Sequence, residues 1–197
     1  MENNSEYFIL KRENNKNYPL LVAEENVDYE YCKDIIENIE NIKIEYSLRK
    51  PIPKKPEFVD YHPSPKSIIS EKIKEMLLDF KLEKVQFIPA IIYGKNDEIY
   101  DNYFYFHIYN YIEVLDKENS KYEWLETANV ASPIEKLVLR KDVLYQIPLE
   151  KRLIFRLKEN HTFEIFHKKV VDKILEINPS GLRFIKVEDW NISVPFN

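Results

Sequence analysis

Hydrophobic and polar side chains alternate along residues 103–115 with a period of two. Phe104, Phe106, Ile108, Ile112 and Val114 share one side, and Tyr103, Tyr105, His107, Tyr109, Tyr111 and Glu113 share the other. This period predicts a long strand with one side in the core. The other side, the tyrosine face, is expected either to lie under a helix or to face a partner. Asn110 interrupts the hydrophobic side and predicts a bend or bulge there.

A second strand is predicted just upstream. Residues 85–93 are hydrophobic on nearly both sides, which is typical of a central strand. Pro89 lacks a backbone donor and predicts a bulge or an unpaired position. A turn at residues 94–97 would join the two strands into a long central hairpin, about 85–115, on which the fold is built.

The remaining pattern predicts short strands and a few helices. Apolar side chains spaced at i, i+3 and i+4 predict helices over residues 31–39, 71–80 and 167–177. Shorter strands are expected over residues 6–12, 19–23 (pairing back on 6–12), 120–126, 134–140, 153–157, 163–166 and 182–187. Five prolines make residues 51–65 an extended crossing segment. Consecutive strands favour an α+β fold with a largely antiparallel sheet, in one domain spanning 1–197.

Charge changes this picture at one place. The net charge is −5, and residues 24–45 hold eight carboxylates against two lysines. The helix predicted there would turn Ile35, Ile36 and Ile39 inward and its carboxylates outward. Such a helix is either a solvated face or an acidic recognition surface for a basic partner, which charge complementarity would attract over long range.

Composition argues against several classes of function. The chain has only two glycines, Gly94 and Gly181, whereas phosphate-binding loops and nucleophile elbows need several close together. The acidic balance disfavours nucleic-acid binding. Cys32 is the single cysteine, and the sequence shows neither a signal peptide nor a membrane span, so the cytoplasm is the expected location.

Candidate catalytic groups are few. His161 and His167 are six residues apart, a spacing unlike known zinc motifs, and exposed turn histidines are the ordinary interpretation. His107 lacks a positioned partner in the sequence and is expected to be packed or interfacial. The loop acids Asp97, Glu98 and Asp101 do not have calcium-loop spacing. No metal or cofactor is therefore expected.

Several segments carry a family resemblance through their order and spacing over residues 6–188. They are residues 85–89 after a helix led by Ser70, Tyr105, residues 110–116 followed by Ser120, residues 153–157, and residues 181–184. In these the chain resembles the immunity proteins of bacterial polymorphic toxin systems classed as family eleven, formerly a domain of unknown function. The resemblance implies a small cytoplasmic antitoxin that binds a cognate toxin domain and blocks it, with no catalytic residues.

Two surfaces are candidates for that contact, the acidic segment and the tyrosine face, and the toxin would be basic, for example a nuclease. The expected partner-binding residues are Glu24, Glu25, Asp28, Glu30, Asp34, Glu37, Glu40, Tyr103, Tyr105, His107, Tyr109 and Tyr111. The alternative function is a small hydrolase or transferase that uses His107 with carboxylates from elsewhere in the fold. A third possibility is a structural or regulatory module of a larger assembly.

Overall fold

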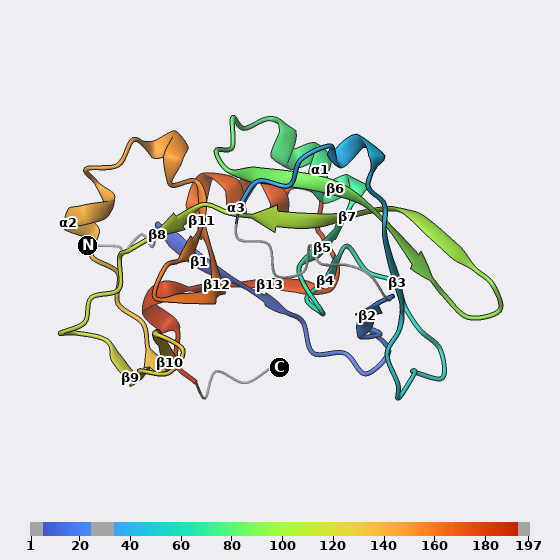
Figure 1. The fold of residues 1–197 in the computed structure, drawn as a ribbon, viewed down its shortest axis with the longest axis horizontal. Coiled ribbons are helices and arrows are strands. Elements are labelled where there is room, and N and C mark those ends of the chain that lie inside the picture. The colour runs from blue at the N-terminus through green and yellow to red at the C-terminus, as the bar shows by residue number, and fades with distance from the viewer. Residues whose placement is uncertain (1–5, 25–33, 193–197) are drawn as a thin grey trace.

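Strands dominate the computed structural model, which describes residues 6–24 and 34–192 (Figure 1). Over this part of the chain the strands form three sheets, accompanied by the α-helices α1 (Glu71–Leu78), α2 (Lys141–Leu144) and α3 (Lys168–Leu175). Most strand pairs are antiparallel, and the exceptions are β3 with β6 and β8 with β11. The predicted α+β class is therefore confirmed. None of the helices described is long and apolar enough to cross a membrane.

The six-stranded sheet contains the central hairpin. Its order is β2-β3-β6-β7-β5-β4, with bounds Leu21–Ala23, Ile44–Leu48, Val85–Tyr93, Ile99–Ile108, Ile68–Ser70 and Tyr61–His62. The hairpin of β6 and β7 places Phe87 opposite Phe106 and extends toward the right edge of Figure 1. Pro89 pairs with Phe104, and the register shifts just beyond it, between Ala90 and Ile92. The strand therefore contains an irregularity next to Pro89, as the sequence analysis predicted.

The predicted strand over 103–115 is not one strand. It leaves the six-stranded sheet after Ile108 and continues as β8 (Tyr111–Ile112) in the five-stranded sheet. The Asn110 amide donates to the carbonyls of Lys151 and Ile154, both at 2.9 Å. The predicted bend at Asn110 is confirmed, because the buried amide satisfies backbone groups where the chain changes sheets.

The other two sheets lie on the opposite side of Figure 1. The five-stranded sheet has the order β13-β1-β12-β11-β8, with bounds Leu182–Lys186, Tyr7–Arg12, Asn160–His167 and Ile154–Leu157 for the first four. A two-stranded sheet pairs β9 (Lys121–Leu125) with β10 (Val130–Lys136). The predicted pairing of residues 6–12 with 19–23 is wrong, because β1 pairs with β12 and β13 while β2 pairs with β3.

The two faces of the central hairpin pack against different parts of the structure. Phe106 and Ile108 share a core with α1, α3 and the five-stranded sheet. Tyr103 and Tyr105, on the other side, share a core with Ile36 and with strands of their own sheet. Within the described residues, Tyr103 and Tyr105 are therefore covered by irregular segments of this chain, around Ile36 and Phe58, and not by an α-helix.

Candidate functional site

The acidic segment contains an exposed ledge on the central hairpin. We use the name acidic ledge for residues 34–40, whose carboxylates Asp34, Glu37 and Glu40 are all exposed. Glu24, at the end of β2, is also exposed, whereas Glu25, Asp28 and Glu30 lie outside the described residues. The helix predicted over 31–39 is wrong for its described part, which is irregular up to the 3-10 turn η2 (Ile39–Asn41).

The side chain of Gln86, on β6, forms two hydrogen bonds with the backbone of the acidic ledge. Its side chain accepts a hydrogen bond from the Ile36 backbone N–H at 2.9 Å and donates one to the Ile36 carbonyl at 2.8 Å. The Ile36 side chain is buried in the core of the six-stranded sheet. A polar side chain in an otherwise hydrophobic strand thus replaces the pairing that a helix would have given this backbone.

His107 holds the ledge at a second point. Its Nε2 lies 2.7 Å from the Asp34 carbonyl oxygen, and its Nδ1 lies 3.1 Å from the Tyr105 hydroxyl. Because a carbonyl only accepts, Nε2 carries the proton and Nδ1 accepts from the tyrosine. Burial lowers the pKa of His107, so the ring is neutral at neutral pH. The histidine therefore positions the ledge and is committed on both nitrogens.

Ile35 gives the ledge a hydrophobic centre. The prediction that it points inward is wrong, since its side chain is 57% exposed, next to the exposed Asp34 and near Glu37. Only Ile36 of the three predicted isoleucines is fully buried, and Ile39 is half-buried. A large apolar side chain among carboxylates combines the features of an interface centre and an interface rim.

The tyrosine face is less accessible than the sequence suggested. Tyr103, Tyr105 and His107 are 5%, 2% and 1% exposed, so in this conformation they do not offer their side chains to a partner. Tyr109 and Tyr111 are half-buried. The Tyr109 ring stacks on His107 with centroids 5.3 Å apart, which places this tyrosine beside the ledge.

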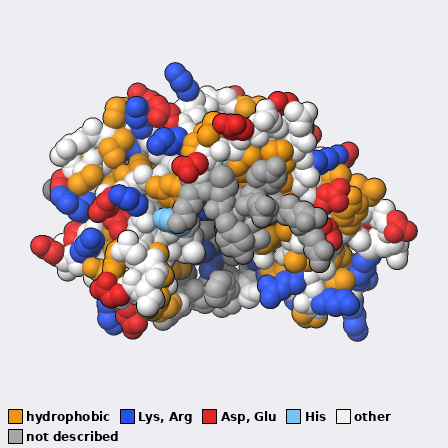
Figure 2. Space-filling model, in the orientation of Figure 1, with side chains coloured by type: hydrophobic (Ala, Val, Ile, Leu, Met, Phe, Trp, Pro, Cys, Tyr) orange, Lys and Arg blue, Asp and Glu red, His pale blue; other side chains and the backbone are white. Residues whose placement is uncertain are grey.

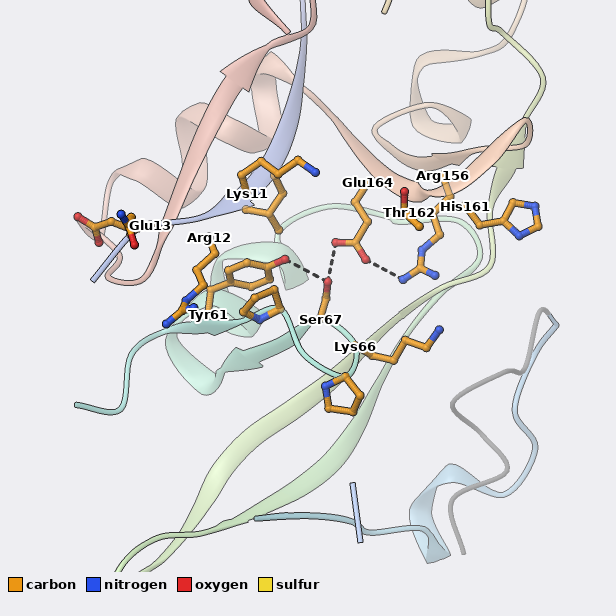
Figure 3. Close-up of a pocket in the computed structure, with 14 residues that line it drawn as sticks. Lys11, Arg12, Glu13, Tyr61, Lys66, Ser67, Arg156, His161, Thr162 and Glu164 are labelled. Atoms are coloured by element: carbon orange, nitrogen blue, oxygen red, sulfur yellow. Dashed lines mark hydrogen bonds and ion pairs between the residues drawn. The ribbon is translucent and has the colours of Figure 1, made fainter. Parts of the chain in front are cut away.

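A cleft of about 670 Å³ opens where the two large sheets meet (Figure 3). At its floor the Ser67 hydroxyl donates to Glu164 at 2.7 Å, and Arg156 pairs with the other oxygen of Glu164 at 2.7 Å. The Tyr61 hydroxyl lies 3.3 Å from Ser67. The ion pair is almost fully buried and joins β11 to β12, and the Ser67 hydrogen bond connects it to the segment before β5.

The cleft does not gather the groups that the hydrolase alternative needs. His107 is not among its described lining residues, and its nitrogens are bonded to Tyr105 and to the Asp34 carbonyl. Ser67 donates its hydrogen bond to a carboxylate that is already paired with Arg156, and the Nε of this arginine is buried without a partner in the described part of the chain. These polar contacts tie the two large sheets together at the floor of the cleft.

The other histidines also have structural surroundings. His167 is buried and caps α3, accepting a hydrogen bond from the Lys169 backbone N–H at 3.1 Å, so its interpretation as an exposed turn residue is wrong. The half-buried His161 packs against the Tyr111 ring with centroids 4.6 Å apart. Among the described residues, no group of three His, Cys, Asp or Glu side chains is placed to hold a metal ion.

Comparison with known families decides the classification. The model of the immunity protein family Imm11 matches residues 31–189, which is most of the chain. The chain belongs to the Imm11 family. No curated protein matches it. The matched residues include the ledge, the central hairpin and the part of the cleft lined by residues 61–164, whereas residues 10–14 of the cleft lie before the matched region.

The sequence analysis did not foresee that His107 and Gln86 hydrogen-bond the backbone of the acidic ledge. His107 was expected to be packed, which the structure confirms, but its bond to the ledge was not foreseen. The signal for Gln86 was present in the sequence, because it is the one amide in the hydrophobic run 85–93. A lone amide in such a run indicates that nearby backbone groups need hydrogen-bond partners.

Proposed function

We propose that this Imm11 protein is an antitoxin, a single domain of residues 1–197 that binds a cognate toxin domain of a bacterial polymorphic toxin system and neutralises it by contact. The observation that carries the proposal is the family match over residues 31–189. The protein would act in the cytoplasm of the producing cell and protect it in competition between bacteria. Inhibition of this kind needs a rigid complementary surface and no catalytic group.

The acidic ledge is the surface that we assign to this contact. Its backbone is bonded to Gln86 and His107, so little ordering entropy remains to be lost on binding. Ile35 supplies an exposed hydrophobic anchor, and the half-buried Tyr109 extends the surface over His107. The carboxylates Glu24, Glu25, Asp28 and Glu30 belong to the same acidic segment and complete the proposed attraction for a basic toxin such as a nuclease.

The first experiment tests the function itself. The toxin domain encoded beside this gene is expressed in a susceptible bacterium with and without the protein, and survival is counted. We expect growth only when both are present, and we expect the purified proteins to form a complex. Killing that persists in the presence of well-expressed, folded protein contradicts the proposal.

The second experiment tests the surface. Lysine replaces Asp34, Glu37 and Glu40 together, and association with the toxin domain is followed by stopped flow at low and high salt. We expect the association rate at low salt to fall by about tenfold or more and to lose its salt dependence, because attraction across the interface is reversed. The control variant makes the same change in net charge at exposed carboxylates elsewhere, namely Glu75, Glu123 and Glu126. Equal effects in the two variants would remove the ledge from the interface.

A further inference from the structure

A second hollow, of about 430 Å³, lies at the end of the molecule that carries α2. Three segments line it: residues 113–118, the start of α2 with Arg140 before it, and the turn between β11 and β12. Its lining includes the carboxylates Glu113, Asp116, Glu118, Asp142 and Glu159, against the cations Lys117 and Arg140. We call it the acidic pocket. On the face seen in Figure 2, side chains of both charges lie at this end of the molecule.

Glu159 is the unusual member of the acidic pocket. The residue is only 5% exposed, and its Oε1 accepts a hydrogen bond from the Leu115 backbone N–H at 2.8 Å. Its Oε2 is buried and accepts no hydrogen bond within the described part of the chain. A carboxylate oxygen that is shielded from water and accepts no hydrogen bond raises the free energy of the folded protein. A hydrogen-bond donor from a bound partner would remove this penalty at Oε2.

Three cationic side chains in the walls around Glu159 have ion-pair or ring partners of their own. The Lys158 ammonium pairs with Glu113 at 2.9 Å, and Arg140 pairs with Asp142 at 2.7 Å. Lys117 lies over the Trp124 ring, 5.4 Å from its centroid. The ammonium and guanidinium groups around the pocket therefore have partners of their own, and none of them donates a hydrogen bond to Oε2 of Glu159.

The rim of the pocket is ionised and negative. A hydrogen bond from Lys158 lowers the pKa of Glu113, and a hydrogen bond from Asn119 lowers that of Asp116. A hydrogen bond from Arg140 lowers the pKa of Asp142. These groups keep their charge at neutral pH, so the pocket attracts a cation before any contact forms.

We propose that the acidic pocket receives an arginine side chain of the toxin domain, whose guanidinium donates to Oε2 of Glu159 while the rim carboxylates surround it. A guanidinium offers several N–H donors in one plane and can satisfy a buried carboxylate and a rim carboxylate together. The hollow adjoining the pocket is lined by Trp124 and also by Glu159, and it offers an apolar wall to the aliphatic part of the side chain. The inference rests on the proposed function, since it names a residue type on the same partner.

The test uses a peptide in place of the toxin. A capped tetra-arginine peptide is titrated into the whole protein by calorimetry, with the Glu159→Gln variant alongside. We expect binding to the unchanged protein and an affinity at least about tenfold weaker in the variant, because a charge-assisted bond is lost. Glu75→Gln, which removes one exposed carboxylate on α1, is the matched control and should change the affinity less than twofold.

Further arms decide between interpretations. The exposed rim variant Glu118→Gln should weaken binding several-fold without disturbing the fold, so it repeats the test if Glu159→Gln lowers the melting temperature. Equal weakening by Glu75→Gln would reduce the effect to general electrostatics and overturn the proposal, as would the absence of peptide binding. Spermine that binds as tightly as the peptide, with the same dependence on Glu159, would assign the pocket to a free polyamine and overturn it too.

The outcome is independent of the protection experiment. A protein that protects cells but shows no Glu159-dependent peptide binding keeps its proposed function and loses the acidic pocket as a contact. A protein that binds the peptide through Glu159 but gives no protection has the pocket without the antitoxin function.

Discussion

Replacing Gln86 by leucine tests whether the sheet beneath the acidic ledge holds it in place. Leucine preserves much of the side-chain volume but removes both bonds to Ile36, at 2.9 and 2.8 Å. Each such bond contributes about 1 kcal/mol net, so the substitution should cost about 2 kcal/mol of local stability. That cost corresponds to about thirtyfold in the equilibrium between the closed and the open ledge.

Hydrogen exchange measures this opening directly. The Ile36 amide is protected by a side chain and not by a strand ladder, so we expect its exchange to accelerate by about thirtyfold in Gln86→Leu. Binding of the toxin domain should weaken by up to the same factor, because the ledge must then be ordered during association. Amides in β11 and β12, in the other large sheet, should exchange as before.

The control makes the same substitution at the other glutamine. Gln146 is exposed just after α2, and Gln146→Leu should leave exchange at Ile36 unchanged. Unaltered exchange at Ile36 in Gln86→Leu would refute the reasoning, since the ledge would then be held by something other than this amide. Acceleration spread evenly over all strands would also refute it, because the change would then be global and not local.

Three further predictions concern the fold. Burial lowers the pKa of His62 to about 4, so the unfolded state takes up the proton first, and the free energy of unfolding should fall by about 3 kcal/mol between pH 6.5 and pH 4. Urea midpoints measured against pH should show this fall, and His62→Gln should reduce it; the same fall in both proteins would contradict the prediction. Glu164→Gln leaves Arg156 buried without its charged partner and should lower the free energy of unfolding by about 3–5 kcal/mol. The apolar double variant Arg156→Met with Glu164→Leu should regain most of this stability in thermal melts, and no gain would show that the loss does not come from the unpaired charge. Gly181→Ala places a side chain at φ 82° against Val59, so chemical unfolding should show a loss of about 2–4 kcal/mol, and unchanged stability would argue against this close packing.

The sequence predicted what depends on local periodicity. The first hairpin strand, over residues 85–93, and the helices after Ser70 and His167 appear close to their expected bounds, because their strand and helix periods are long. The second hairpin strand was expected over 103–115 and instead occupies 99–108. Strands of three to five residues carry too little pattern, and β3 (Ile44–Leu48), which lies beside the hairpin, was not foreseen. The expected strand over 134–140 instead occupies 130–136.

Long-range pairing could not be predicted from periodicity. After the interruption at Asn110 the alternation of residues 103–115 resumes in the same phase, and it gives no sign that the chain changes sheets there. Ile108 and Ile112 are both buried, but in two different cores. The acidic ledge was misjudged for a related reason. A helix was inferred from three isoleucines, whereas the backbone of Ile36 is bonded by Gln86, a residue fifty positions away.

Charge alone is a poor basis for recognition, since exposed carboxylates attract any basic protein. Each of the two acidic surfaces adds something that charge does not supply. On the ledge it is Ile35, which gains affinity only if the partner offers an apolar contact at that point. In the acidic pocket it is Oε2 of Glu159, which is satisfied only by a donor that reaches below the rim. The carboxylates on both surfaces would set the association rate of a basic toxin. Ile35 and Oε2 of Glu159 would set the dissociation rate, and with it which toxin is bound tightly. Charge reversal on the ledge should therefore act mainly on association rates, while truncation of Ile35 or neutralisation of Glu159 should act mainly on dissociation rates.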